Sequence, residues 1–133
     1  MNSDEGDPLE RLVVDKNQIN KERLAKALAP VVGIDESGEV VPLEGFRDLD
    51  TAGRITAFLL AQRAALLLDA IDESEYGMST SELADWAEVS GGTVRHHASD
   101  KPFIDKDRQS GNLIIPTHSV GRAIEYLEGK RNP

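Results

Sequence analysis

The sequence predicts a small mixed protein, mainly α-helical with small β-hairpins (α+β), and three observations lead to that class. Several stretches place apolar residues three or four positions apart, which is the spacing of one helix face. Two pairs of strand-like runs each flank a short segment rich in Asp, Ser and Gly, which is typical of hairpins. The chain has 133 residues, a length that suits one compact domain with a small extension.

The composition excludes several classes of protein. There is no cysteine, which excludes disulfide scaffolds and thiolate metal sites. The opening "MNSDEGDPLERL" is acidic and lacks the apolar run of a signal peptide, so we expect a cytoplasmic protein. The most apolar run, "ITAFLLAQRAALLLDAI", is interrupted by Gln62 and Arg63. That interruption favours a buried helix and no membrane span.

Charge is unevenly distributed along an acidic chain. The net charge is -9, from 24 acidic and 15 basic residues, which opposes non-specific nucleic-acid binding. The dispersed acids and the low share of lysine, six against nine arginines, resemble in composition the halophilic proteins of salt-loving archaea. Residues 91–133 nevertheless hold seven bases, five acids and all three histidines. Such asymmetry hints at a surface that faces a polyanion.

We expect residues 1–18 to form a mobile acidic tail with a weak turn at 9–14. Residues 19–49 should form an extension made of one helix and one hairpin. Asn20 is expected to cap the helix and Pro30 to end it. The predicted inner residues of that helix are Leu24, Ala25 and Leu28.

The hairpin of this extension is predicted from "VVGIDESGEVVPL". Its two β-branched runs flank residues 35–38, which have turn chemistry with a glycine at the end. Pro42 confines the second run to a sheet edge, because proline cannot donate a ladder hydrogen bond.

A long central helix should follow, capped by Asp50 or Thr51 and ending at about Ile71. Its apolar residues occupy more than one face, so other elements must cover it on several sides. These residues are Ile55, Phe58, Leu59, Leu60, Leu66, Leu67 and Leu68.

Two short helices come next. Ser79 and Glu82 have the S-x-x-E spacing of a capping box and predict a helix to about Ala87. Ser90 is expected to cap a second helix over residues 91–99. The inward residues of the pair should be Leu83, Ala84, Val94 and Ala98.

A second hairpin and a last helix complete the chain. The run "PFIDKDRQSGNLIIP" alternates around residues 110–112 and predicts a hairpin over 103–116. Thr117 or Ser119 should cap a helix to about residue 128, with 129–133 as a C-terminal tail. Its inner face follows the i, i+3, i+4, i+7 rule at Val120, Ala123, Ile124 and Leu127.

The stretch "ELADWAEVSGGTVRHHASDKPFI" and the hairpin after it resemble the winged helix-turn-helix superfamily of DNA-binding proteins. The resemblance depends on Leu83-Ala84, the hinge Val89-Ser90, the run Thr93-Val94-Arg95 and the hairpin 103–115 as a wing. It covers residues 50–128. It implies a winged helix-turn-helix domain preceded by the helix-hairpin extension.

Three residues depart from the usual pattern of that superfamily. Glu88 stands where a turn glycine is common, which implies a turn without a positive φ. Ala98 stands where leucine usually seals the third helix, which implies thinner packing unless a neighbour fills the gap. Pro102 replaces a frequent glycine.

In winged helix-turn-helix proteins the third helix enters the major groove, and its N-terminal residues reach base edges. The resemblance implies that this exposed face holds Ser90, Gly91, Gly92, Thr93, Arg95, His96 and His97. The hydroxyl groups suit phosphate, the glycines allow close approach of the backbone to phosphate, and Arg95 suits a guanine edge. The alternative is a loose Gly-Gly turn and a solvated arginine.

Further cations follow the third helix, at Lys101, Lys106 and Arg108. Because wing tips in that superfamily commonly touch the DNA backbone or the minor groove, the resemblance implies that these side chains face DNA, with Arg108 towards the backbone. The alternative is that they pair with the interleaved carboxylates, for little gain in stability. Those carboxylates belong to Asp100, Asp105 and Asp107.

The sequence gives little support for a metal site or for an enzyme. Adjacent histidines on a helix point about 100° apart, and His96, His97 and His118 have no zinc-ligand spacing. We therefore expect no metal, no cofactor and no enzymatic activity. Trp86 is expected to be a core or interface anchor.

The sequence thus predicts a transcriptional regulator that binds specific duplex DNA. The alternative is a winged domain that serves as a protein-interaction or assembly module, because the net acidity disfavours DNA. A homodimer through the 117–128 helix and the 51–71 helix is also expected, since a small domain leaves part of the long helix uncovered.

Overall fold

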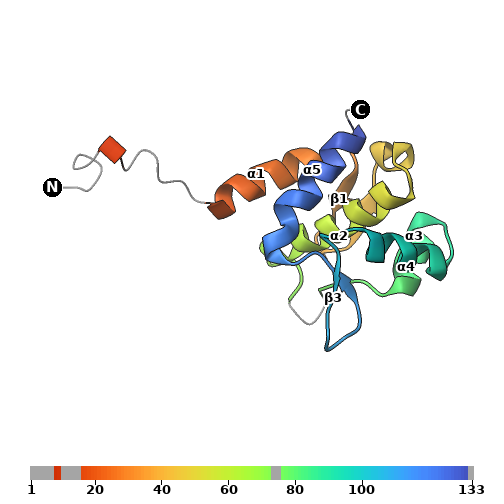
Figure 1. Ribbon diagram of the computed structural model, residues 1–133. Coiled ribbons are helices and arrows are strands. Elements are labelled where there is room, and N and C mark those ends of the chain that lie inside the picture. Colours follow the sequence, from red (N-terminus) through yellow and green to blue (C-terminus); the bar gives the residue numbers. More distant parts are fainter. Residues whose placement is uncertain (1–7, 10–15, 73–75, 132–133) are drawn as a thin grey trace.

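The structure, a computed structural model, describes residues 8–9, 16–72 and 76–131. It is a mixed α and β fold, as expected, and Figure 1 shows its helices gathered around α2 with the two hairpins beside them. The α-helices are α1 (Lys16–Leu28), α2 (Thr51–Leu67), α3 (Thr80–Ala87), α4 (Gly91–Asp100) and α5 (Val120–Arg131). The strands are β1 (Val32–Ile34), β2 (Val40–Pro42), β3 (Asp105–Lys106) and β4 (Leu113–Ile114), with 3₁₀ turns η3 (Glu44–Asp48) and η5 (Thr117–Ser119).

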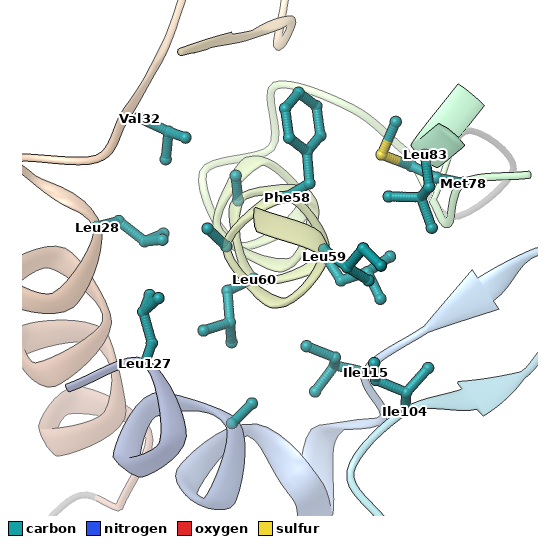
Figure 2. Close-up of a cluster of buried hydrophobic side chains, with 14 of the residues drawn as sticks. Leu28, Val32, Phe58, Leu59, Leu60, Met78, Leu83, Ile104, Ile115 and Leu127 are labelled. Carbon is teal, nitrogen blue, oxygen red and sulfur yellow. The ribbon is translucent and has the colours of Figure 1, made fainter. Parts of the chain in front are cut away.

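Helix α2 is the centre of the core, which confirms its predicted role as a scaffold. Phe58, Leu59 and Leu60 are at most 2% exposed. Figure 2 looks along this helix and shows Leu28 and Val32 on one side of it, with Leu83 and other side chains on the opposite side. A helix that is apolar on several faces is stable in water only when neighbours cover those faces.

The C-terminal end of α2 differs from the prediction. The helix ends at Leu67 and not at Ile71, because Asp69 adopts a left-handed conformation with φ 58°. Leu67 and Leu68 are 42% and 69% exposed, so this end of the apolar run stays partly uncovered within the single chain.

Helix α1 starts earlier than expected. It begins at Lys16, so residues 16–18 belong to the helix and Asn20 lies inside it without capping it. The run from Lys16 contains mostly good helix formers and no glycine or proline, so nothing stops extension towards the N-terminus. The inner alanine is Ala27, fully buried, while Ala25 is exposed. The predicted turn at 9–14 lies almost wholly outside the described residues.

The structure contains the first hairpin that was predicted from the turn residues 35–38. Strands β1 and β2 pair antiparallel, with Gly33 opposite Val41. The Asp35 carboxylate accepts hydrogen bonds from the N–H groups of Ser37 and Glu39, at 2.9 and 3.0 Å. Gly38 takes φ 88°, which a glycine adopts without strain.

Helices α3 and α4 have the predicted caps. The capping box is complete, because Ser79 Oγ accepts from the Glu82 N–H and the Glu82 carboxylate accepts from the Ser79 N–H. The turn between the helices is not as expected: Glu88 takes φ 60° and ψ 43°. A left-handed residue is needed here to end α3, and glutamate adopts this conformation at some cost.

The second hairpin is shorter than its sequence suggests. Strands β3 and β4 are two residues each. Met78, just before α3, forms an additional antiparallel bridge with Leu113. The two residues exchange N–H···O hydrogen bonds of 2.8 and 3.1 Å. This bridge, which the sequence did not reveal, fixes the hairpin to the start of α3.

Helix α5 follows the 3₁₀ turn at residues 117–119 and runs to Arg131, so residues 129–131 are not a tail. Val120, Ile124 and Leu127 are at most 4% exposed. These side chains pack inside the single chain, against α2 and α1. A homodimer would therefore have to use other residues than these three.

Candidate nucleic-acid interface

The position of α4 is set by two buried side chains and one cap. Val94 is fully buried and Ala98 is 9% exposed, so the helix turns this stripe to the core. Ser90 Oγ accepts the Thr93 N–H at 3.2 Å and lies 2.9 Å from Thr93 Oγ1. The opposite face of α4, with Gly92, Arg95 and His96, is exposed. Of the predicted outer face, Ser90 is exposed as well, whereas Gly91, Thr93 and His97 are half-buried.

Arg95 folds back over the N-terminal turn of its own helix. A methyl group added at Gly91 would lie 3.4 Å from Arg95 Nη1, and one added at Gly92 would lie 3.8 Å from Nη2. Both distances are ordinary van der Waals contacts, so small side chains at these positions would be compatible with this guanidinium group. The sequence had suggested a use for the two glycines, the close approach of the backbone to phosphate. That use would place an anion at the helix N-terminus, where backbone N–H groups are directed outward.

A groove of about 290 Å³ runs between α4 and the second hairpin. Arg95 lines it from α4 and Lys106 lines it from β3, so two predicted site residues face one hollow. Its apolar lining includes Ala98, Ile104 and Leu113. A leucine at position 98 would project into this space, so the small alanine is one reason why the groove exists. Thr80, which the sequence analysis overlooked, also lines it.

Lys101 is placed differently from the other predicted cations. Its ammonium group lies 3.1 Å from Asp100 Oδ2 and 5.1 Å from the centre of the Tyr126 ring. The hydrogen bond with Asp100 raises the pKa of Lys101 and lowers the pKa of Asp100. With its side chain only 18% exposed, Lys101 packs towards α5 and away from the groove.

The hairpin carboxylates bond to their own loop. Asp105 Oδ1 accepts the Lys106 N–H at 2.8 Å. Asp107 Oδ2 accepts the Ser110 hydroxyl at 2.8 Å, which lowers the pKa of Asp107. Within the part of the chain that the structure describes, Arg95, Lys106 and Arg108 form no ion pair. Lys106 and Arg108 are also exposed, so they remain available to an anionic partner.

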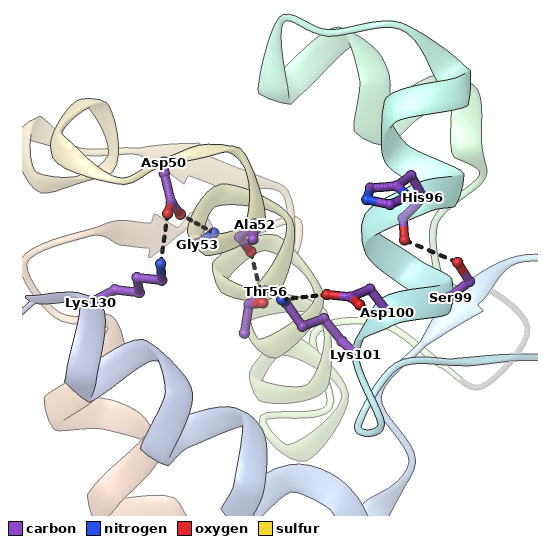
Figure 3. A network of polar contacts seen from close by, with 9 residues as sticks. All are labelled: Asp50, Ala52, Gly53, Thr56, His96, Ser99, Asp100, Lys101 and Lys130. Atoms are coloured by element: carbon purple, nitrogen blue, oxygen red, sulfur yellow. Dashed lines mark hydrogen bonds and ion pairs between the residues drawn. The ribbon is translucent and has the colours of Figure 1, made fainter.

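The histidines form no metal site among the described residues. The rings of His96 and His97 are 5.5 Å apart in an edge-to-face arrangement. No group of three or more His, Cys, Asp or Glu side chains suited to a metal occurs in residues 8–9, 16–72 and 76–131. Figure 3 shows His96 on α4, where its carbonyl oxygen accepts the Ser99 hydroxyl at 3.0 Å.

Asp50, also drawn in Figure 3, anchors the start of α2. Its carboxylate accepts the Gly53 N–H at 2.8 Å and the Lys130 ammonium at 2.7 Å. Partial burial alone would raise the pKa of Asp50, but these two hydrogen bonds outweigh it and lower the pKa. The network holds the start of α2 to the end of α5.

Acidic side chains flank the candidate interface on α3. Glu82 and Asp85 on that helix, and Glu88 directly after it, are all exposed. Residues 76–115 contain six acids and four bases, a net charge of -2. The positive charge of α4 and the hairpin is therefore local.

Comparison with protein-family models, with curated proteins and with solved structures finds no match to this chain. None of the helices in the described ranges combines the length and the apolar character needed to cross a membrane.

Proposed function

We propose that residues 50–128 are a winged helix-turn-helix domain that binds specific duplex DNA as a transcriptional regulator. Helix α4 would enter the major groove and the hairpin 103–116 would act as the wing. The order of α2, α3, α4 and hairpin supports this assignment, as does the bridge from Met78 to Leu113. A cytoplasmic location follows from a DNA partner.

The observation that supports DNA binding most directly is the state of Arg95. Its guanidinium group is exposed at the N-terminal end of α4, has no ion-pair partner among the described residues and shares a groove with Lys106. A bidentate contact between arginine and guanine contributes about 1–3 kcal/mol of discrimination. Thr93 and His96 would lie beside it, and Arg108 would approach the sugar-phosphate backbone.

A DNA-shift assay in molar potassium chloride tests this proposal. Binding sites would first be selected from a pool of random duplexes with the native chain. Arg95→Ala should then weaken binding to the selected duplex about 5- to 150-fold, the equivalent of 1–3 kcal/mol. Arg122→Ala, which removes the same charge from an exposed position on α5, is the matched control and should bind normally. Equal retardation by native and Arg95→Ala proteins would remove Arg95 from the recognition role.

One observation favours the second candidate function, a protein-interaction module. The exposed acids of α3 adjoin α4 and would repel a phosphate backbone at low ionic strength. A module of this kind would select no duplex from the random pool, and Arg95→Ala would change nothing. The same assay therefore separates the two functions.

A further inference from the structure

A second hollow lies between α1, β1 and the C-terminal end of α2, and it shares no lining residue with the groove between α4 and the second hairpin. Its volume is about 370 Å³, within the range of about 300–1,000 Å³ that small-molecule sites occupy. Leu24 and Leu28 line it from α1, and Leu67 and Leu68 line it from the end of α2. We call this hollow the α1–α2 groove.

The lining of the α1–α2 groove is apolar with one exception. Eleven described residues line it, and Lys21 is the charged one among them. Lys21 is exposed, and it forms no ion pair within the described part of the chain. Binding sites for small molecules are typically apolar with a few polar groups that fix the orientation of the ligand.

The end of α2 gives a second reason to expect an apolar occupant. Leu67 and Leu68 are 42% and 69% exposed, although burial of a leucine side chain stabilises by about 1.5–3 kcal/mol. The left-handed Asp69 ends the helix directly after them. The chain thus holds two leucines at the groove, where a bound apolar molecule would remove them from water.

We propose that the α1–α2 groove binds a medium-chain carboxylate, with its alkyl chain against the leucines and its head group paired with Lys21. A cation beside an apolar groove is complementary to an amphipathic anion. A twofold contact with a second copy of the chain is less favourable, because it would bring two Lys21 ammonium groups into one apolar interface.

This ligand site is independent of the proposed DNA binding. The groove lies on the side of α2 that faces Leu28 of α1 and Val32 of β1, whereas Leu83 of α3 packs on another side (Figure 2). Binding can be measured on the protein alone, so a failed DNA-shift assay would leave this proposal standing.

Isothermal titration calorimetry of the full chain with decanoate tests the site. Hexanoate, octanoate and decanoate should bind with rising affinity, up to about fourfold per methylene group, as burial of hydrocarbon requires. Lys21→Gln should weaken decanoate binding about two- to fivefold, the range of an exposed ion pair, and leave the binding of decanol unchanged. Lys26→Gln removes the same charge from an exposed position on α1 outside the groove lining and should behave as the native chain.

A blocking variant tests the location. Ala25 lines the groove and is exposed, so Ala25→Trp should fill the space, leave the circular dichroism spectrum intact and abolish binding. The proposal is overturned if decanoate does not bind, if Lys21→Gln weakens decanol as much as decanoate, or if folded Ala25→Trp binds normally. It is also overturned if sedimentation shows a native dimer that Ala25→Trp dissociates, because the groove would then be a self-contact.

Discussion

Replacing Glu88 by glycine should stabilise the protein, because Glu88 ends α3 in a conformation that glycine adopts freely. Its φ is 60° and its ψ is 43°, and the left-handed region costs an ordinary residue about 1–2 kcal/mol. Its N–H bonds to the carbonyl oxygens of Ala84 and Asp85, so the backbone conformation closes the helix. Glu88→Gly would preserve those hydrogen bonds and remove the strain.

Two opposing effects reduce the gain. Glycine makes the unfolded chain more flexible, which costs about 0.4–1 kcal/mol. The contact between Arg54 Nη1 and Glu88 Oε2 is long, at 3.8 Å, and the Glu88 side chain is 83% exposed, so its loss costs only a few tenths of a kcal/mol, about what exposed pairs contribute. The net stabilisation should be about 0.5 kcal/mol, which corresponds to a rise in melting temperature of about 2 °C.

Urea denaturation of three variants isolates the backbone effect. Glu88→Ala loses the same ion pair but keeps a residue with a Cβ in the left-handed conformation. The free energy of unfolding should therefore be about 0.5–1 kcal/mol higher for Glu88→Gly than for Glu88→Ala. Glu125→Gly, at an exposed position inside α5, should instead destabilise by about 1 kcal/mol. If Glu88→Gly is no more stable than Glu88→Ala, the strain argument fails.

Three further predictions concern α4, α2 and α5. Gly91→Ala should raise the free energy of unfolding by about 0.5 kcal/mol and leave DNA binding unchanged, because its methyl group would lie 3.4 Å from Arg95 Nη1, an ordinary van der Waals distance; thermal melts and the shift assay measure the two effects. Asp50 has a lowered pKa, so its charge stabilises the fold above the ordinary carboxyl pKa, and that contribution disappears as the pH falls below about 4. Asp50→Asn keeps a capping side chain but loses the Lys130 pair, so its urea midpoint should fall less than the native midpoint on acidification. Ile124→Ala, at a fully buried position, should cost about 2–5 kcal/mol, and an unchanged urea midpoint would mean that α5 does not pack as described.

The features that sequence reasoning predicted well depend on local chemistry. The cap at Asp50, the capping box at Ser79 and the cap at Ser90 each require only a side chain and N–H groups two or three residues away. The turn at 35–38 likewise closes on its own Asp35 carboxylate. Caps and turns of this kind can be predicted from sequence because their hydrogen bonds depend little on how the rest of the chain packs.

The features that it missed depend on distant neighbours. The apolar run of α2 continues to Leu68, just after the helix, but which leucines are buried depends on how α1 and β1 pack against it; Leu67 and Leu68 line a groove beside those elements and stay exposed. The bridge between Met78 and Leu113 joins residues 35 positions apart, and no local pattern marks it. Helix periodicity identifies an apolar face and cannot say what covers it.

The candidate site shows the same division. The resemblance to winged helix-turn-helix proteins implied an exposed Arg95 on α4, and the apolar spacing identified Val94 and Ala98 as inward. The sequence could not predict that the Arg95 side chain would fold over Gly91, since Gly91 also suited close approach to phosphate and Arg95 suited contact with a guanine edge. It grouped Lys101 with the DNA-facing cations, whereas Tyr126 draws its ammonium group towards α5. Side-chain direction depends on packing partners that a single helix does not reveal.

The net charge of -9 argues against DNA binding only where electrostatic forces act over long distances. Salt screens the repulsion between exposed charges beyond a Debye length, which is about 10 Å at 0.1 M salt and about 3 Å at 1 M. In molar salt the acids of α3 would scarcely act on a phosphate, while a guanidinium at hydrogen-bonding distance from guanine would keep its contact. Arg95, Lys106 and Arg108 can neutralise few phosphates, so the salt-dependent loss of affinity, which scales with the number of phosphates contacted, is small as well. A DNA-binding function for this chain therefore predicts that binding persists or strengthens from low to molar salt, opposite to the behaviour of a basic DNA-binding protein.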